Sequence, residues 1–332
     1  MSPLTEDPVE TSLLVLSGDE VRRLDLPSVI TSQRTAFLGL SSGEALLGPR
    51  VLLAGPEDSM VFSYAARTRV DSTPVAKFGC VAPANARRGT PVVSAVVLAL
   101  DPVNGRPAAV VNGEAVTEIR TVATSMLAAD ALTAAADRIT VIGSGTQGRL
   151  HARVAAERFP SADLRICSPL DRTLPAFVDE LSATGATITA AESVQEAVGG
   201  ADLVFTCTTA RQPILYWPWV SPGATLICIG GFAPDRSEVD VDTVARSRVV
   251  VDDLATAQTQ AGPIVAALAA GRLTSSQLTG LGDVLATGRS PRTEAEDVVL
   301  FNSVGLGIQD AALVDLLLER SHEEGWGSPV RL

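Results

Sequence analysis

The second half of the chain repeats one pattern, in which a short run of apolar and β-branched residues is followed by a helix-like or polar segment. Short continuous apolar runs predict buried strands, and strands that alternate with helices predict a parallel, doubly wound sheet. The predicted strands are Ile139–Ile142, Leu164–Cys167, Ala186–Ala190, Asp202–Thr208, Thr225–Gly231 and Arg248–Asp252. This half therefore predicts an α/β domain of the Rossmann type.

The first part of the chain is β-rich in a different way. Its apolar runs are separated by turn residues, and the turn Asp101–Gly105 and the pair Asn112-Gly113 are typical of hairpins. We therefore expect a sheet with antiparallel character. Its predicted strands are Leu13–Leu16, Arg50–Ala54, Ser59–Ser63, Pro74–Cys80, Pro91–Leu100 and Arg106–Val111.

Helical spacing predicts a short helix over 32–40, a long alanine-rich helix over 114–136 and an amphipathic helix over 308–320. A doubly wound domain ends near its sixth strand, so the last helix must bury its apolar face elsewhere, and we expect it to return to the first domain. The predicted division is residues 1–125 with 308–332, an α+β domain, and residues 126–307, the Rossmann domain.

Composition narrows the class of protein. The 332 residues are 46% hydrophobic and 19% charged, which is ordinary for a globular protein. A net charge of −12 argues against nucleic acid as a partner, because phosphate binding needs accumulated positive charge. The four cysteines have no C-x-x-C spacing, so neither a metal site nor a disulfide framework is indicated, and a reducing, cytoplasmic compartment fits. No stretch resembles a targeting signal or a membrane span.

The segment Gly143-Ser144-Gly145-Thr146-Gln147-Gly148 follows the first predicted strand of the Rossmann domain and opens a helix. In a G-x-G-x-x-G turn the first glycine permits the tight turn, the second lets a pyrophosphate approach, and the third allows close packing of helix and strand. The helix N-terminus then faces an anion, so Gly143, Gly145, Thr146, Gln147 and Gly148 are candidate cofactor-binding residues. A glycine-rich turn without a ligand is the competing interpretation.

The residues after the second strand of such a domain choose between the two nicotinamide dinucleotides. Here the strand ends at Ser168, which tolerates a 2′-phosphate, and Arg172 is placed to pair with one. We therefore favour NADP(H) over NAD(H). Asp171 competes with this prediction, because an acid facing the ribose would reverse the preference.

Few residues are suited to proton transfer. The chain has two histidines, His151 and His322, and for both a packing or surface role is the better interpretation. Lys77 is the single lysine among 26 basic residues. An ammonium group can shift its pKa and transfer a proton where a guanidinium cannot, so Lys77 is a candidate catalytic residue, although an accidental surface lysine is the alternative.

Several short motifs, taken in order over most of the chain, resemble the ornithine cyclodeaminase/mu-crystallin family. They are Pro49-Arg50, the Lys77 strand, Leu100-Asp101-x-x-Asn104-Gly105, Thr117-x-x-Arg120-Thr121, the GSGTQG turn, Gln212-Pro213-Ile214, Trp219-x-x-Pro222-Gly223-Ala224, Pro234-x-x-x-Glu238, and Phe301 to Gly305 through Gln309-Asp310.

This resemblance implies an NAD(P)-dependent enzyme that is a homodimer, with substrate binding and dimerisation in the first domain and the nicotinamide between the domains. It also implies that Arg50, Lys77 and Arg120 surround the α-carboxylate of an amino or imino acid. Three cations that converge on one cleft agree with an anionic ligand, since they would otherwise repel one another. The remaining candidates are Thr208, Gly230 and Ser303 for the cofactor and Phe232 and Asp310 for the substrate pocket.

One departure from the family pattern bears on the reaction. In the cyclodeaminases, the loop after the fifth strand of the Rossmann domain resembles Gly-Gly-Asp, and its acid serves the substrate amine. This chain has Gly230-Gly231-Phe232 there, so the acid is absent. Oxidation of an amine needs a nearby base, whereas reduction of a protonated C=N bond needs only alignment with the nicotinamide. Asn302 stands where the family usually has lysine, as in the branch that forms 2,3-diaminopropionate.

The leading hypothesis is therefore an NADPH-dependent reductase that converts an imine or ketimine of an α-carboxylate into the amine. Arg50 and Arg120 would clamp the carboxylate and Lys77 would supply a proton. One alternative is an amino-acid dehydrogenase or cyclodeaminase that acts oxidatively, the 2,3-diaminopropionate-forming type included. The other alternative is a cofactor-binding relative without catalytic activity.

Overall fold

The computed structural model describes residues 12–331, apart from the side chains of Ser12 and Ala86. The acidic N-terminal stretch, which we expect to carry no targeting signal, lies outside the described residues. The chain folds into two compact units, Met1–Arg120 with Gly307–Leu332 (unit 1) and Thr121–Leu306 (unit 2). Residues 1–125 with 308–332 are predicted to bind the substrate and form the dimer, and residues 126–307 are predicted to bind the dinucleotide. Both roles stay predictions.

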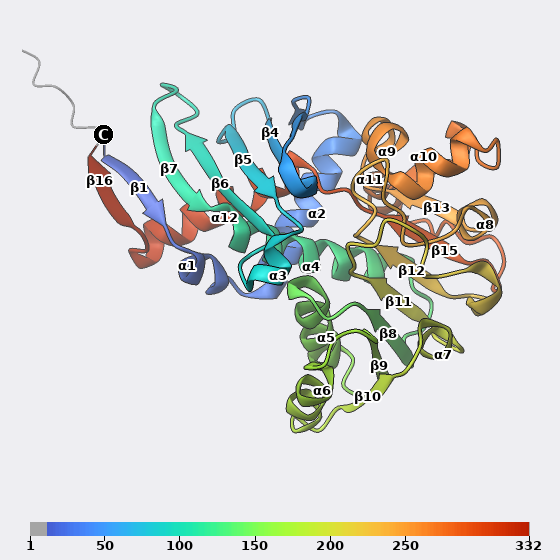
Figure 1. Cartoon of the computed structure of the whole chain (residues 1–332). Coiled ribbons are helices and arrows are strands. Elements are labelled where there is room, and N and C mark those ends of the chain that lie inside the picture. Colours follow the sequence, from blue (N-terminus) through green and yellow to red (C-terminus); the bar gives the residue numbers. More distant parts are fainter. Residues whose placement is uncertain (1–11, 332) are drawn as a thin grey trace, which may run out of the picture. The chain divides into compact units, whose positions relative to one another are not determined.

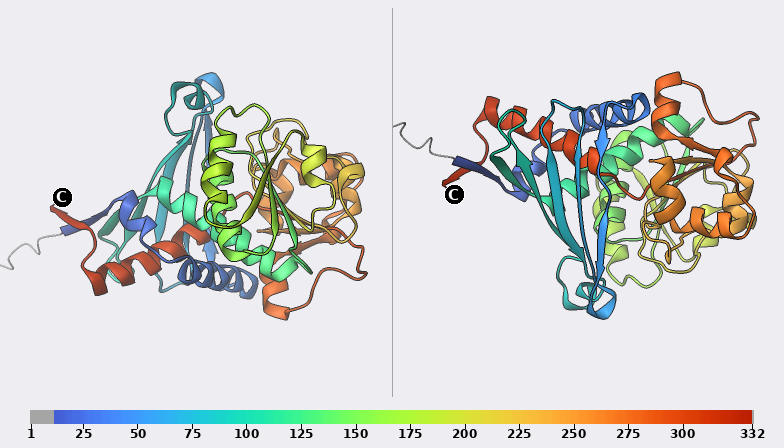
Figure 2. Two further views of the ribbon diagram at one scale, coloured as in Figure 1. Left: turned by 90° about the horizontal axis from the view of Figure 1, so that it is seen from below. Right: turned by 90° about the horizontal axis from the view of Figure 1, so that it is seen from above.

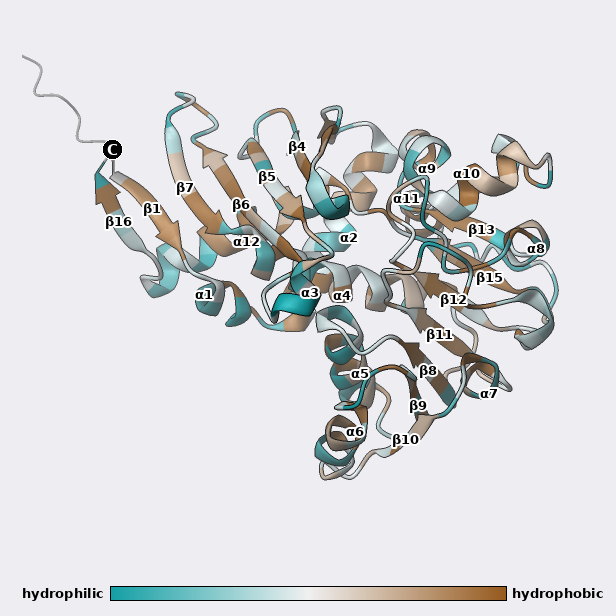
Figure 3. Cartoon of the chain, viewed as in Figure 1, coloured by the Kyte–Doolittle hydropathy of each residue, from teal (hydrophilic) through white to brown (hydrophobic). Residues whose placement is uncertain are grey.

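Unit 2 contains an eight-stranded sheet in the order β10-β9-β8-β11-β12-β15-β13-β14, and every neighbouring pair in it is parallel. Its central strands are buried at every position, as strands covered on both faces must be, and they are mostly apolar (Figure 3). The strands are β8 Arg138–Ile142, β9 Asp163–Cys167, β10 Thr187–Ala191, β11 Leu203–Thr206, β12 Thr225–Cys228, β13 Arg248–Val251, β14 Leu278–Gly280 and β15 Val299–Asn302.

The strand order confirms the doubly wound fold. The chain passes from β8 outward to β9 and β10, then returns to the other side of β8 with β11 and β12 (Figure 1). Ligands of such sheets bind outside the carboxyl ends of the strands at this reversal. The helices that begin in or belong to this unit are α5 Thr146–Arg158, α6 Leu174–Ser182, α7 Val194–Val198, α8 Val241–Arg246, α9 Leu254–Gln260, α10 Gly262–Ala269 and α11 Leu281–Thr287, with short 3₁₀ turns at Trp217–Trp219 and Ser275–Gln277.

Unit 1 contains a mixed sheet in the order β16-β1-β7-β6-β5-β4-β2, with β3 also paired to β4. All its strand pairs are antiparallel except β1 with β7, so the expected antiparallel character is confirmed. The strands are β1 Ser12–Leu16, β2 Leu46–Leu47, β3 Val51–Ala54, β4 Met60–Arg67, β5 Val75–Val81, β6 Val93–Leu100, β7 Pro107–Asn112 and β16 Ser328–Arg331.

The helices of unit 1 are α1 Gly18–Arg22, α2 Leu26–Ser42, α3 Asn85–Arg88 and α12 Gly307–Glu324, with a 3₁₀ turn at Pro56–Asp58; α4, Gly113–Leu132, begins in this unit and continues into unit 2. The helix predicted over 32–40 begins earlier because Asp25 caps it, accepting a hydrogen bond from the Ser28 N–H at 2.9 Å. Helix α12 packs against α2, β4 and β5, and the two views of Figure 2 show α2 and α12 along the sheet.

The two faces of the unit 1 sheet differ. Lys77 lies between Tyr64 on β4 and Val97 on β6 in the register of the sheet, and all three side chains are buried. Phe78 and Val96, one residue further along, point to the opposite face and are 60% and 48% exposed. The buried face therefore carries the single lysine, and the other face is apolar and open.

None of the helices in the described part of the chain is long and apolar enough to cross a membrane. The four cysteines are free thiols. The expected cytoplasmic compartment stays a prediction.

Candidate active site

Unit 1 brings Lys77 and Arg120 together around one carboxylate. Lys77 Nζ donates to Oδ1 of Asp310 at 2.9 Å, and Arg120 Nε donates to the same oxygen at 3.1 Å. Lys77 also donates to the Thr117 hydroxyl at 2.5 Å, and the Tyr64 hydroxyl donates to Oδ2 of Asp310 at 2.7 Å. Thr117 and Arg120 lie three residues apart on α4, so they share one face of that helix.

The cluster of Lys77, Arg120 and Asp310 is almost sealed from water. Lys77 is 1%, Arg120 8% and Asp310 0% exposed. Burial lowers the pKa of Lys77 to about 8, and the opposing attraction of Asp310 keeps it from falling further. Burial by itself raises the pKa of Asp310, but the charges of Lys77 and Arg120 outweigh it and hold this pKa below its ordinary value. Asp310 is therefore ionised, and two buried cations share one buried anion.

Arg50, the third predicted cation, joins this cluster through an aromatic ring. Its guanidinium lies over the ring of Tyr64 at 5.2 Å, and Tyr64 donates to Asp310. Gln309 completes the arrangement, because its side-chain oxygen accepts from Arg120 Nη1 at 3.1 Å. The three predicted cations thus lie in one network of unit 1.

The glycine turn of unit 2 lies between β8 and α5, as the motif predicts, and two of its glycines serve the fold. Gly143 has φ of +105°, and a Cβ atom there would lie 2.6 Å from the Cys207 carbonyl oxygen. A Cβ atom at Gly148 would lie 2.0 Å from the Gly143 carbonyl oxygen, so helix and strand could not pack as they do.

Gly145 differs from both, because a Cβ atom there would meet nothing within 4 Å. It occupies the N-cap position of α5 without any side-chain cap, and Thr146 and Gln147 form the first turn. The protein itself does not require glycine at 145, whereas a pyrophosphate approaching the uncapped N–H groups would require it. The turn therefore fits a dinucleotide.

Helix α5 is held to α4 by His151, which is fully buried. Its Nδ1 lies 2.8 Å from the Gln147 carbonyl oxygen and its Nε2 lies 2.8 Å from the Ser125 hydroxyl. Because a carbonyl can only accept, Nδ1 carries the proton and Nε2 accepts from Ser125. Burial lowers the pKa of His151 to about 4, so it is neutral and has a packing role.

The end of β9 is more crowded than the sequence suggests. Asp171 accepts hydrogen bonds from Ser144 of the glycine turn at 2.5 Å, from Arg149 at 2.9 Å, and from the Thr173 N–H and hydroxyl at 2.8 and 2.7 Å. These bonds outweigh burial and lower the pKa of Asp171 to about 2. Ser168 is partly buried, and Arg172 is exposed with no hydrogen-bond partner among the described residues.

Thr208 and Gly230, two predicted cofactor residues, are both held by Glu238. One oxygen of Glu238 accepts from the Thr208 N–H at 2.7 Å and from its hydroxyl at 2.8 Å. The other accepts from the Thr206 hydroxyl and the Gly230 N–H, both at 2.7 Å. Glu238 is 0% exposed, and burial raises its pKa against the effect of these bonds. It fixes the loops after β11 and β12 to each other.

Asp252 holds the loop after β15 in place, as Glu238 holds the loops after β11 and β12. Its carboxylate accepts from the Ser303 hydroxyl at 3.1 Å and from the N–H groups of Val304 and Gly305 at 2.7 and 2.9 Å. The neighbouring Asn302 donates to the Cys228 carbonyl oxygen at 3.0 Å, while its own side-chain oxygen is buried and has no partner among the described residues. An unpartnered acceptor at the carboxyl edge of a parallel sheet suits a ligand with an N–H or O–H donor.

Phe232, the predicted pocket residue of unit 2, is partly buried, and the guanidinium of Arg236 lies 5.4 Å from its ring centre. Arg236 in turn donates to the Thr209 carbonyl oxygen at 2.9 Å.

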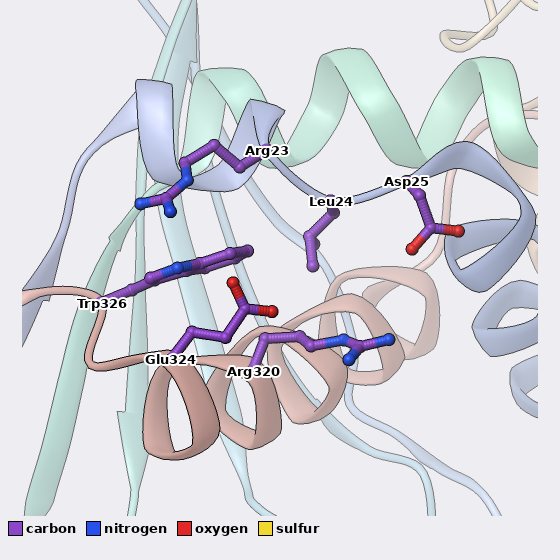
Figure 4. A pocket seen from close by; sticks show the side chains of 6 residues that line it. All are labelled: Arg23, Leu24, Asp25, Arg320, Glu324 and Trp326. Carbon is purple, nitrogen blue, oxygen red and sulfur yellow. The ribbon is translucent and has the colours of Figure 1, made fainter.

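A surface pocket of about 400 Å³ in unit 1 contains none of these groups (Figure 4). It lies at the far end of α12 from Asp310, where Arg23 covers the ring of Trp326 at 4.3 Å.

Within residues 12–331, no group of three or more His, Cys, Asp or Glu side chains is placed to hold a metal ion.

Sequence reasoning missed four contributors to these clusters: Tyr64, Arg149, Glu238 in its loop-holding role, and Asp252. Asp252 had a signal, because it directly follows the apolar run 249–251. Glu238 stands among polar residues, and only its place in the Pro234-x-x-x-Glu238 motif pointed to it. Tyr64 and Arg149 had none, since their partners lie 246 and 22 residues away.

The sequence matches the model of the ornithine cyclodeaminase/mu-crystallin family over residues 20–325. Delta(1)-pyrroline-2-carboxylate reductase 2 of Burkholderia ambifaria is 30% identical over 292 residues, which are 87% of this chain and 89% of that protein. The solved Delta(1)-pyrroline-2-carboxylate reductase of Thermococcus litoralis, in complex with NADH and L-proline, is 27% identical, with a TM-score of 0.90 over 96% of this chain and 100% of that one. An archaeal alanine dehydrogenase dimer with bound NAD is 25% identical, with a TM-score of 0.90 over 97% and 100% of the two chains.

Proposed function

The chain belongs to the ornithine cyclodeaminase/mu-crystallin family and is an NAD(P)-dependent oxidoreductase, and on this premise we propose that it reduces an imine or ketimine of an α-carboxylate to the amine. Cyclic imino acids are included in this substrate class. The observation that carries the proposal is the buried cluster in which Lys77 and Arg120 share the carboxylate of Asp310.

The charge of this cluster favours an anionic substrate. One lysine and one arginine face one carboxylate, so the buried trio carries an excess positive charge. A buried charge without a partner is strongly unfavourable, and the carboxylate of an imino acid would neutralise it. Arg120 offers its remaining N–H groups for a bidentate contact, and Arg50 lies over the ring of Tyr64, which donates to Asp310.

Reduction of the C=N bond adds a hydride to carbon and leaves an amine whose nitrogen must hold a proton. Bound NAD(P)H would supply the hydride. Lys77, with a pKa of about 8, is mostly protonated at neutral pH and releases its proton far more readily than an ordinary lysine. We assign Lys77 as the proton donor, and its contact with Thr117 fixes the direction of the ammonium group.

The cofactor would be held by Gly145, Thr146 and Gln147 at the N-terminus of α5, with Thr208, Gly230 and Ser303 on the following loops. We keep the preference for NADP(H), because four hydrogen bonds already occupy the Asp171 carboxylate and the exposed Arg172 is available for a 2′-phosphate. Against this preference stand the NADH and NAD bound by the two solved relatives.

A second function has one specific observation in its favour. The archaeal relative is an alanine dehydrogenase, so an amino-acid dehydrogenase reaction is within reach of this fold at 25% identity. Phe232, which stands where the cyclodeaminases resemble an acid and has Arg236 against its ring, favours the reductive direction, because oxidation needs a base near the amine.

We also propose a homodimer formed through the open face of the unit 1 sheet. That face is apolar, with Phe78 60%, Val96 48% and Leu98 36% exposed. Monomeric proteins rarely leave such a patch uncovered, and the archaeal alanine dehydrogenase is a dimer.

The test begins with a titration of NADPH and NADH on the same protein, followed by oxidation of the preferred cofactor with piperideine-2-carboxylate and pyrroline-2-carboxylate. Lys77→Ala should abolish turnover and leave cofactor affinity nearly unchanged. Turnover at the wild-type rate in this variant would refute the role of Lys77. Oxo acid and ammonia formed from an amino acid and NAD(P)⁺, without imine reduction, would favour the dehydrogenase.

A further inference from the structure

Both oxygens of Asp310 are already bonded to side chains of the protein. Lys77 and Arg120 occupy its Oδ1, Tyr64 occupies its Oδ2, and the residue is 0% exposed. We propose that Asp310 is a positioning residue, which orients Lys77 and Arg120 and supplies the negative charge that keeps Lys77 protonated. The expectation that Asp310 lines the substrate pocket stays a prediction. The inference rests on the proposed function only in what it says about turnover.

Hydrogen bonds from α12 and α4 fix the directions of the Arg120 guanidinium and the Lys77 ammonium group. Consecutive residues of α12 hold two edges of the Arg120 guanidinium: Asp310 accepts from Nε at 3.1 Å and Gln309 accepts from Nη1 at 3.1 Å. The Nη2 group has no hydrogen-bond partner among the described residues and is left for an incoming carboxylate. Lys77 is held in the same way, by Asp310 and Thr117, and has one N–H remaining of three.

The surrounding charges make Asp310 decisive for Lys77. Arg120 on α4 and Arg50 before β3 are both positive and lower the pKa of Lys77, as burial does. Tyr64 on β4 is neutral, because burial raises its pKa well above the ordinary value, and β6 places Val97 opposite Lys77. The negative charge of Asp310 opposes these effects and raises the pKa of Lys77.

The variant Asp310→Asn removes the charge and keeps the hydrogen bonds. Its amide oxygen can accept from Lys77 and Arg120, and its amide nitrogen can donate to the Tyr64 hydroxyl. Lys77 is the single lysine of the chain, so the full-length protein labelled with ¹³C-lysine gives one side-chain Cε signal whose titration reports this residue alone.

The wild-type titration midpoint is expected near pH 8. In Asp310→Asn it should fall by about one pH unit or more, because an opposite charge at this distance shifts a pKa by roughly 1–3. An unchanged midpoint in this variant would overturn the inference.

Two further variants separate the charge of Asp310 from general repacking. Asp315→Asn changes the same chemical group on the same helix, where Asp315 accepts from Thr68 at 3.0 Å, and it should leave the midpoint unchanged. Tyr64→Phe keeps the charge of Asp310 and removes one donor to it, so the midpoint should stay or rise. A fall with Tyr64→Phe would refute the proposal even if Asp310→Asn failed to fold.

The pH dependence of turnover distinguishes this inference from the proposed function. If Lys77 is the proton donor, the rate falls as pH rises through its pKa, and Asp310→Asn moves that fall to lower pH. A shifted lysine signal with an unshifted rate profile would uphold the positioning role of Asp310 and refute Lys77 as the donor.

Discussion

His151 illustrates how burial alone sets the charge of a single residue. Burial lowers its pKa to about 4, while the Gln147 carbonyl opposes this effect. Between pH 6.5 and pH 4 the unfolded chain binds a proton at this residue and the folded chain does not. The protein should therefore lose stability as pH falls through this window, by roughly 3 kcal/mol from this residue. Urea unfolding at pH 7 and pH 4.5 measures the loss.

The comparison that isolates this effect uses both histidines. His151→Gln should lose clearly less stability on acidification than the wild type, because glutamine does not titrate. His322 is exposed, and His322→Gln should behave as the wild type does. Equal acid sensitivity in all three proteins would refute the buried neutral histidine.

The resemblance to the family placed Arg50, Lys77 and Arg120 as cations around one ligand, and the structure brings them into one network. Their counterion was harder to predict. Asp310 was predicted to line the substrate pocket, and this stays a prediction. The sequence does not show that Tyr64, 246 residues away, donates to its second oxygen. Residue types predict chemistry, but the partners of a buried carboxylate depend on packing over long sequence separation.

At the scale of the element, two glycines of the strand–turn–helix from β8 to α5 have different roles. Gly148 is required by the packing of the protein, whereas Gly145 is expected to be required by the cofactor. Gly148→Ala would place a methyl group 2.0 Å from a backbone oxygen, so we expect destabilisation of about 2 kcal/mol or more, measured by urea unfolding. Gly145→Ala meets nothing within 4 Å, so stability should stay within about 1 kcal/mol of wild type.

The Gly145→Ala variant also tests the proposed dinucleotide site. Gly145→Ala should weaken cofactor binding at least about tenfold in a fluorescence titration, because the added methyl group stands where the pyrophosphate would approach the backbone. Wild-type affinity in Gly145→Ala would show that no phosphate lies against this turn.

The loops after β11 and β12 depend on a carboxylate at position 238. Glu238 accepts four hydrogen bonds, two of them from the N–H groups of Thr208 and Gly230. In Glu238→Gln the amide nitrogen must face one of these N–H groups, so the free energy of unfolding should fall by about 1–3 kcal/mol and the KM for the cofactor should rise. Glu180→Gln removes an exposed pair with Arg153 and should change stability by less than about 0.5 kcal/mol. If Glu238→Gln had the stability and the cofactor KM of the wild type, these loops would not need the charge of Glu238.

Elements with strong patterns were predicted from the sequence, and weakly patterned ones were not. The parallel strands β8 to β13 lie close to their predicted ranges. All but the edge strand β10 are largely buried, and their short apolar runs leave little choice of structure. Helices α8 to α11 have between 6 and 8 residues each, too short to show a helical period. The edge strand β16 includes a proline and is exposed throughout, so its pairing with β1 comes from tertiary structure.

For the whole molecule, the open face of the unit 1 sheet predicts association of two copies. Phe78 on β5 lies beside Val96 on β6 on this face, and both side chains are exposed within the described part of the chain. Phe78→Glu would place a charge inside the proposed interface, and burial of an unpaired charge is strongly unfavourable, so this variant should sediment as a monomer with an unchanged far-UV circular dichroism spectrum. Val103→Glu, at a turn position that is 93% exposed, carries the same charge away from this face and should remain a dimer. If the wild type itself sediments as a monomer, or if Phe78→Glu stays dimeric, the partner copy does not bind here and the apolar face requires a different explanation.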